Sequence, residues 1–468
     1  MPLDQPENFA PLAAGNPHDV VRAFSANPAF RAAEWEELTT EDNPYRRPVR
    51  PDDLAWLDYS KQMPVAKALK LSALLGHRML RNVYDSELLL LPPAASPAAA
   101  SDAATFYSDS NRTLGALAAP VLERHLFSLL ESERKPLAAY GTDQVTAAIE
   151  AYHQQRTAET GRAFTTALGT SDRKASATFV LLQLSAYLPA SRVAIGRAAL
   201  GEFDAGHPGA RVALLDDYRT WAGLHPEYRS LLEGAGLTTT TGAYWQLYLG
   251  TSLARGNHLH RLSRNREQYP EFLGALLHHS IDQSATAARF ADVFEDGFGV
   301  RPTLFDHLGG EPGHLRELAG RWVEPLRRLY GPEAVERFHN GFADAAWLAQ
   351  LWDEDLAQQL AWADDIPLHQ EKAERIHRHI EDNGITVDLD TFVESNEETS
   401  TTHVHDEHRL VMVERGEMHF WNNVTHKIDL HEGDKVLIPV SRLHGSTVLS
   451  GECTYHQPII PEDMYARF

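Results

Sequence analysis

The sequence has 468 residues, of which 43% are hydrophobic and 23% are charged, which is ordinary for a soluble protein with several folded domains. Its 65 acidic residues outnumber the 43 lysines and arginines, and the net charge of -22 argues against binding to nucleic acid or to an anionic membrane surface. The single cysteine, Cys453, excludes an intramolecular disulfide and any metal site that needs two thiolates.

Two features of the sequence bear on the cellular location of the protein, namely its first residues and the length of its apolar stretches. MPLDQPENFA lacks the basic and apolar regions of a secretion signal. No stretch approaches the roughly 18 consecutive apolar residues of a membrane helix. We therefore expect a cytoplasmic protein that acts on a small-molecule substrate and has no nucleic-acid or membrane partner.

The first predicted region is helical. From about Asp19 to Leu91, apolar residues recur at three- and four-residue steps, as in MPVAKALKLSALLGHRMLRNVYDSELLLL. Two prolines end this pattern, and the segment 94–104 that follows them, AASPAAASDAA, predicts a loop or linker. We assign residues 1–104 to an N-terminal helical domain and its linker.

A second helical block starts near Phe106 and continues to about His379. Its long amphipathic pieces include SATFVLLQLSAYLPASRVAIGRAALGEF and YPEFLGALLHHSIDQSATAARFADVF. Most of these pieces have a glycine or a proline within a few residues of their ends, as helices do. We assign residues 105–380 to a central helical bundle.

The composition changes near residue 384. Four segments rich in Val, Ile, Thr and aromatic residues follow: ITVDLDTFVES, HRLVMVERGEMHFW, HKIDLHEGDKVLIPV and STVLSGECTYHQP. Turn residues such as Gly416 and Gly433 separate them at intervals typical of a small antiparallel barrel. We assign residues 381–468 to a β-barrel domain, so the predicted fold class is a multi-domain α + β protein.

Three histidines of this last domain have the spacing of a metal site. His403 and His405 are two residues apart, so their side chains leave one face of a strand. His444 follows a turn-strand-proline unit that would bring it to the same barrel interior. Three neutral nitrogen donors with open coordination positions suit Fe(II), with O2 as co-substrate, and zinc or copper could bind the same ligands.

These spacings resemble the two motifs of the cupin superfamily, G(x)5HxH(x)3-4E(x)6G and G(x)5PxG(x)2H(x)3N. Arg409 occupies the glutamate position of the first motif, and Ser441 and Val448 occupy the inner glycine and asparagine positions of the second. The missing carboxylate implies a site of three histidines, with Glu407 as a fallback ligand on the same strand face. A cupin barrel without metal, used for storage or sugar binding, is the alternative.

Two further residues of the barrel are candidates for contacting the substrate. A buried arginine is costly unless an anion pairs with it, so Arg409 is either a clamp for a substrate carboxylate or turned out to solvent. Tyr455 shares a strand face with Cys453 by parity. Its phenol either forms a hydrogen bond to the substrate or belongs to an ordinary barrel core.

Over nearly its full length the chain resembles the tri-domain, N-nitrosourea-forming metalloenzymes of streptozotocin biosynthesis. The resemblance implies an N-terminal helical dimerisation domain and a heme-oxygenase-like di-iron domain that hydroxylates guanidine nitrogens of an N-methylated arginine. It also implies a mono-iron cupin that rearranges the product oxidatively and forms an N–N bond. By the same resemblance we expect a homodimer in which His403, His405 and His444 hold the cupin iron and Tyr455 assists the rearrangement.

The central domain departs from the ligand pattern of that family, which is Glu, Glu and His from two early helices, another Glu, and then HxxxDxxH. The nearest matches in this sequence are Asp217, His225, His278, His307, Glu311 and His314. The residues around Glu311, LGGEPG, disfavour a continuous helix, and we expect Pro312 to begin a new one. We therefore expect a helical scaffold without an active di-iron site.

Three functions stay open. The leading hypothesis is an Fe(II)- and O2-dependent cupin oxygenase of specialised metabolism, in which Arg409 and Tyr455 orient a small nitrogen-rich substrate derived from an amino acid. The second is a two-site metalloenzyme that also N-hydroxylates a guanidine in the helical domain. The third is a non-catalytic, ligand-binding cupin on a helical dimer.

Overall fold

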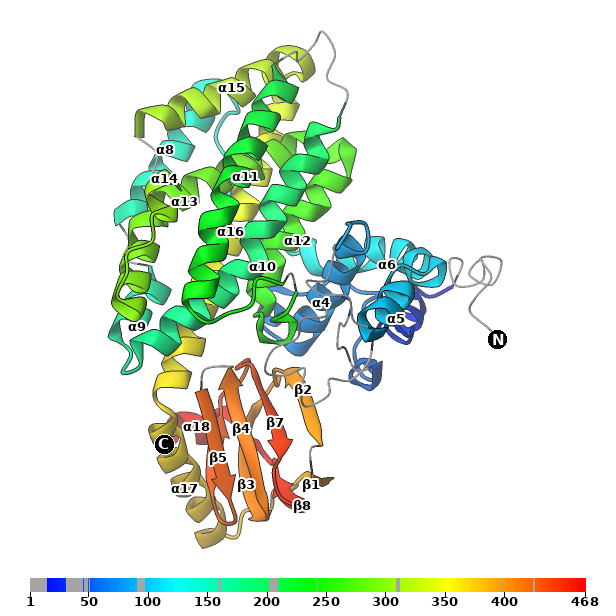
Figure 1. The fold of residues 1–468 in the computed structure, drawn as a ribbon, viewed down its shortest axis with the longest axis vertical. Helices are drawn as coiled ribbons and strands as arrows, with labels where there is room; N and C mark the ends of the chain where they lie inside the picture. The colour runs from blue at the N-terminus through cyan, green and yellow to red at the C-terminus, as the bar shows by residue number, and fades with distance from the viewer. Residues whose placement is uncertain are drawn as a thin grey trace.

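The computed structural model describes residues 15–30, 45, 49, 51–90, 97–158, 161–201, 209–240, 242–308, 312–396, 398–423 and 426–468. All described strands follow a long helical region that ends at Asp382. Figure 1 shows the helical region packed against a smaller β region that contains the C-terminus. The predicted fold class, helical domains followed by an antiparallel β domain, is therefore confirmed, and the domain boundaries at 104/105 and 380/381 stay predictions.

The N-terminal part of the helical region is built around one buried helix. Its described elements are α2 (Pro17–Ser25), η2 (Pro51–Leu54), η3 (Val65–Lys67), α4 (Leu71–Asp85), α5 (Pro97–Phe106), α6 (Asp109–Phe127) and α7 (Leu130–Glu133). Every residue of α4 after Leu71 is buried. This helix packs against α6 and also against the central bundle, so it lies between the two.

The segment predicted as a linker is helical from Pro97 onward. Alanine has the highest intrinsic helix propensity, and this segment contains a run of three alanines directly after Pro97. Proline at the first helical position costs nothing because its missing N–H would have no partner there. The prediction of a loop is therefore wrong for residues 97–104, whereas residues 94–96 lie outside the described part of the chain.

The central part is a bundle of long helices. Its described elements are α8 (Thr142–Ala158), α9 (Arg162–Gly169), α10 (Arg173–Ala199), α11 (Ala210–Gly234), η4 (Trp245–Leu247), α12 (Gly250–Arg264), η5 (Arg266–Gln268), α13 (Tyr269–Phe298), α14 (Leu304–Leu308), α15 (Pro312–Tyr330) and α16 (Pro332–Asp364). Glycines let the backbones of α13 and α16 touch, since a Cβ on Gly274 would lie 1.9 Å from Phe338 O. The predicted helix start at Pro312 is confirmed.

One described helix, α10, is long and apolar enough to cross a membrane by length and composition alone. However, 72% of its apolar window is buried inside the protein. Figure 1 shows α10 among the other helices of the bundle. Its apolar residues therefore serve packing of the bundle core.

The β region consists of two antiparallel sheets. The first contains β1 (Thr391–Ser395), β8 (Glu452–His456), β3 (His408–Arg415) and β6 (Lys435–Ile438), with β9 (Ile459–Ile460) paired to β3. The second contains β2 (Thr399–His403), β7 (His444–Val448), β4 (Glu417–Asn423) and β5 (His426–His431). Side chains from both sheets, among them Val411, Met418 and Val436, form one interior core.

Two helices cover the outer face of the first sheet, α17 (Ile366–Asp382) and α18 (Glu462–Arg467). Alternation along β3 explains how this sheet has two apolar faces. Val411 faces the interior, whereas Leu410 and Met412 point the other way and pack against Ile376 of α17. Trp362, near the end of α16, enters the interior core, so α16 belongs to both regions.

Candidate metal centre

The structure brings together the three histidines that the spacing predicted. His403 is the last residue of β2 and pairs in register with His444, the first residue of β7. His405 lies in the loop after β2, so only part of the predicted HxH strand is a strand. One ring nitrogen from each imidazole lies within 4.8 Å of the other two, and within the described ranges no other group of three possible ligands gathers in this way.

Backbone carbonyls orient two of the imidazoles. Nδ1 of His403 lies 2.8 Å from Thr401 O, and Nδ1 of His444 lies 2.8 Å from Arg442 O. A carbonyl can only accept, so each Nδ1 carries the proton and each Nε2 carries the lone pair. Histidines that bind metals are held in this way in proteins.

The electrostatic surroundings keep His444 neutral. Burial lowers the pKa of His444 to about 4, although its hydrogen bond to Arg442 O opposes this shift, and the positive charge of Arg409 adds to it. A neutral imidazole can coordinate a metal ion at pH 7 without first losing a proton. The donor set therefore fits a mononuclear ion, and Glu407, the predicted fallback ligand, is exposed and outside the cluster.

The loop before His444 has a backbone conformation that favours glycine, the residue expected at this position of the predicted motif. Ser441 occupies the inner glycine position and has a φ of 63°, in the left-handed region that favours glycine. Its N–H donates to His405 O at 3.0 Å. This contact ties the loop that carries His405 to the loop that leads into His444.

Arg409 lies on the inward side of β3 and is paired within the chain. Its parity matches that of Val411, a residue of the interior core. Its Nη1 donates to Asp390 Oδ2 at 2.8 Å and to Gln457 O at 2.9 Å, and the side chain is only 15% exposed. The alternative of a side chain turned out to solvent is therefore wrong, and an anionic substrate would share this guanidinium with Asp390.

Tyr455 and Cys453 both belong to the interior core, as their parity predicted. The Tyr455 hydroxyl donates to Glu394 Oε1 at 2.8 Å, and its ring stacks on Phe392. Burial and the neighbouring carboxylate raise the pKa of Tyr455 well above its ordinary value, so the phenol stays protonated. The sequence interpretation missed Glu394, although its parity with Phe392 on β1 was a usable signal.

The central bundle contains an ion-pair cluster in its core. Asp282 of α13 accepts hydrogen bonds from Arg156 at 2.9 Å and from Arg255 at 2.8 Å, and all three residues are buried. Burial alone would raise the pKa of Asp282, but the two guanidinium groups hold it well below its ordinary value. Because the two guanidinium groups occupy both carboxylate oxygens of Asp282, this carboxylate is not available to a divalent metal ion.

The alternative ligands predicted for the central region do not gather within the described ranges. His278 is buried and shares a hydrogen bond of 2.8 Å with the Tyr152 hydroxyl. Asp217 and His225 lie on α11 and belong to no group of three possible ligands. The side chains of the remaining candidates lie outside the described residues: His307, Glu311 and His314.

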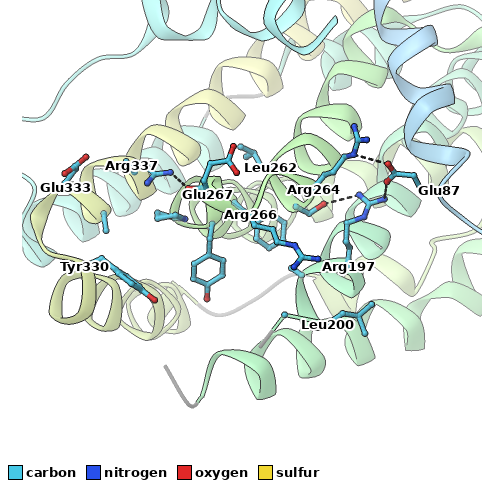
Figure 2. A pocket seen from close by; sticks show the side chains of 17 residues that line it. Glu87, Arg197, Leu200, Leu262, Arg264, Arg266, Glu267, Tyr330, Glu333 and Arg337 are labelled. Carbon is cyan, nitrogen blue, oxygen red and sulfur yellow. Dashed lines mark hydrogen bonds and ion pairs between the residues drawn. The ribbon is translucent and has the colours of Figure 1, made fainter. Parts of the chain in front are cut away.

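A large cavity of about 980 Å³ lies in the helical region and not at the three histidines. Figure 2 shows Arg197 and Arg264 beside Glu87 on one side of it and Arg337 on the other. Glu87 pairs with Arg197 and Arg264, and Arg337 pairs with Glu271. Three of the arginines that line the cavity are thus paired with carboxylates, and none of the predicted site residues lines it.

Together these observations define a class of protein: a helical chain whose C-terminal antiparallel β domain presents three histidines suited to a single metal ion. No known family model matches the chain. It is, however, 27% identical to the nitrosourea synthase of Streptomyces achromogenes subsp. streptozoticus over 453 residues, which cover 95% of each protein. This similarity supports the resemblance drawn from the sequence, and we conclude that the chain is an enzyme.

Proposed function

We propose that the protein is an Fe(II)- and O2-dependent oxygenase of natural-product biosynthesis. It would rearrange a small nitrogen-rich substrate derived from an amino acid, with formation of an N–N bond. The observation that carries the proposal is the convergence of His403, His405 and His444 in a chain that is similar to nitrosourea synthase over 95% of its length. The proposal retains the cytoplasmic location and the homodimer that we expected from the sequence.

The three histidines would hold the ion through their ring nitrogens. When bound, Fe(II) supplies the redox chemistry that an oxidation by O2 requires. Because the three ligands contribute no negative charge, the site favours an anionic substrate that can chelate the ion. The hydrogen bonds of His403 and His444 to backbone carbonyls direct these two rings so that Nε2 is the coordinating atom.

Arg409 and Tyr455 would orient the substrate. The charge of Arg409 acts on His444, so the guanidinium lies close enough to influence the centre. It would bind a substrate carboxylate in competition with Asp390. Tyr455 keeps its proton and donates it in a hydrogen bond to Glu394, so its phenol oxygen would accept a hydrogen bond from a substrate N–H and would not act as a general base.

We assign no metal chemistry to the helical bundle. The support for this assignment is the buried cluster of Arg156, Asp282 and Arg255, in which the two guanidinium groups occupy both oxygens of the carboxylate. Hydroxylation of a guanidine would then occur in another enzyme. The substrate would reach this protein already hydroxylated, or it would be a different small nitrogen-rich compound.

The test is a turnover assay with protein loaded with Fe(II) under anaerobic conditions. The N-hydroxylated form of an N-methylated arginine is added with O2, and O2 uptake and products are followed by mass spectrometry. We expect oxidation that requires both iron and O2 and that is lost in His444→Ala.

The two other functions predict different results in the same assay. Iron-dependent consumption of the unhydroxylated arginine would favour the two-site metalloenzyme. Substrate binding without turnover, retained in His403→Ala, His405→Ala and His444→Ala, would favour the ligand-binding barrel and contradict our proposal.

A further inference from the structure

Each of the three histidines has a neighbour in the sequence that forms hydrogen bonds with the helical region. These neighbours are Thr402, Asp406 and Leu443. They belong to β2, to the loop that follows it and to the loop that precedes β7, and Figure 1 shows β2 at the side of the β region that faces the helices. The helical region thus reaches the centre through three separate backbone segments.

Thr402, which precedes His403, is held by Arg78 of α4 and Gln246 of η4. Arg78 Nη1 donates to Thr402 O at 2.7 Å, and its Nη2 donates to Thr402 Oγ1 at 2.9 Å and to Gln246 O at 3.0 Å. Gln246 Oε1 accepts from Thr402 N at 3.1 Å. Arg78 is 0% exposed, and its Nε has no acceptor among the described residues, so the hydrogen bonds of its two Nη atoms are what offsets the burial of this guanidinium.

Helix α16 holds the segment before His444. Gln359 donates from Nε2 to Leu443 O at 3.0 Å and accepts from Leu443 N at 2.9 Å. The buried Arg442 donates from Nη1 to Asp355 O at 3.1 Å and lies 3.3 Å from Asp355 Oδ1. Because Arg442 O accepts from His444 Nδ1, α16 fixes the carbonyl that orients this ring.

Asp406, which follows His405, joins its loop to the start of α4. Leu71 N donates to Asp406 Oδ1 at 3.1 Å, and Lys70 Nζ donates to Asp406 O at 2.8 Å. A carboxylate is favourable at this position because the first N–H groups of a helix have no partner within the helix. The contact exists only when α4 is folded in place.

We propose that Arg78, Gln246 and Gln359 are positioning residues of the three-histidine centre, through which the helical region sets the metal affinity and ligand geometry of the β domain. This inference rests on the proposed metal site and goes beyond it, since the β domain supplies all three ligands itself. Hydrogen bonds behind metal ligands typically change metal affinity by about 10- to 100-fold.

Titration with Co(II) tests the inference without turnover, because visible absorption of Co(II) reports the ligand geometry. Arg78→Met and Gln359→Met should weaken Co(II) binding about 10- to 100-fold and alter the spectrum. The control is Asn111→Leu, which removes a buried amide that donates to Phe106 O at 2.7 Å within the helical region. This control should lower the melting temperature and leave Co(II) affinity and spectrum unchanged.

Folded Arg78→Met and Gln359→Met proteins that bind Co(II) with native affinity and spectrum would overturn the inference. Should Arg78→Met fail to fold, Thr402→Val removes only the hydroxyl that Arg78 contacts, and affinity should fall about threefold. Native affinity in a folded Thr402→Val protein would also contradict the inference. A native protein that binds no Co(II), or whose binding survives His444→Ala, would instead contradict the proposed metal site.

Discussion

Histidines of this protein differ in what surrounds their rings. His403 and His444 each present Nδ1 to a backbone carbonyl, which leaves Nε2 as the coordinating atom. His278 uses Nε2 for the Tyr152 hydroxyl, and its ring also packs against Phe342. Histidines that look alike in the sequence therefore have different surroundings: His403 and His444 are compatible with a mononuclear metal site, whereas His278 packs in the bundle core.

Acid should destabilise the bundle through His278. Burial lowers its pKa to about 3 in the folded protein, compared with an ordinary pKa of 6.5. Between these values the unfolded chain binds a proton that the folded protein does not, so stability falls as the pH drops through this window. From pH 6.5 to 5 this amounts to about 2 kcal/mol for one histidine.

The measurement is urea unfolding of the native protein and of His278→Gln at pH 7.5 and pH 5. Between pH 7.5 and pH 5, we expect the free energy of unfolding to fall by about 2 kcal/mol less in the variant than in the native protein. His431→Gln, at a position with a 60% exposed side chain, should keep the native pH dependence. Identical pH dependence in all three proteins would contradict the explanation.

Removing Asp282 should lower the free energy of unfolding, because two buried guanidinium groups would lose their carboxylate partner. Asp282→Ala leaves Arg156 and Arg255 without their shared carboxylate, and breaking a buried pair in this way typically costs about 3–5 kcal/mol. The matched control is Asp296→Ala, whose partner Arg173 is 44% exposed and whose loss should cost less than about 1 kcal/mol. Chemical unfolding measures both, and equal losses would contradict the account of this core.

At the scale of elements, local sequence patterns predicted most of what the structure contains. The helical block after Phe106, the strands after residue 384 and the helix start at Pro312 all follow from periodicity and turn residues. Residues 97–104 were misread because Pro97 can begin a helix as well as interrupt one. His405 was placed in a strand because parity alone cannot show where β2 ends.

Helix α16 should be needed for the stability of the β region as well as the bundle. Trp362 is 2% exposed and packs in the interior core between the sheets. Trp362→Ala should therefore cost about 3–5 kcal/mol, as is typical for truncation of a buried aromatic residue. Trp56→Ala, at a position that is 76% exposed, should cost less than about 0.5 kcal/mol in the same unfolding experiment, and a similar loss in both variants would argue against this packing.

At the scale of the whole molecule, the centre depends on contacts that no local pattern predicts. The histidine spacing predicted the three candidate ligands because these residues lie within one small domain. Arg78 and Thr402 are separated by 324 positions, and nothing in either segment indicates that they meet. Pairings of this kind are fixed only when the helical and β regions pack together.

The sequence also contained no indication of the ion-pair cluster in the bundle core. Arg156, Arg255 and Asp282 come from three helices, and the sequence interpretation considered only residues that match a known ligand pattern. It therefore predicted the loss of the di-iron site from missing carboxylates. The pairing of Asp282 with two guanidinium groups supports our proposal that the bundle binds no iron.

The central claim is that the protein holds one metal ion, at the three histidines, and none in the bundle. Its most direct test is the iron content of protein reconstituted with Fe(II) under anaerobic conditions and freed of loosely bound metal. We predict about one iron per chain in the native protein and in Asp282→Ala, and almost none in His444→Ala. Native iron content in His444→Ala, or about three irons per chain in the native protein, would contradict the account.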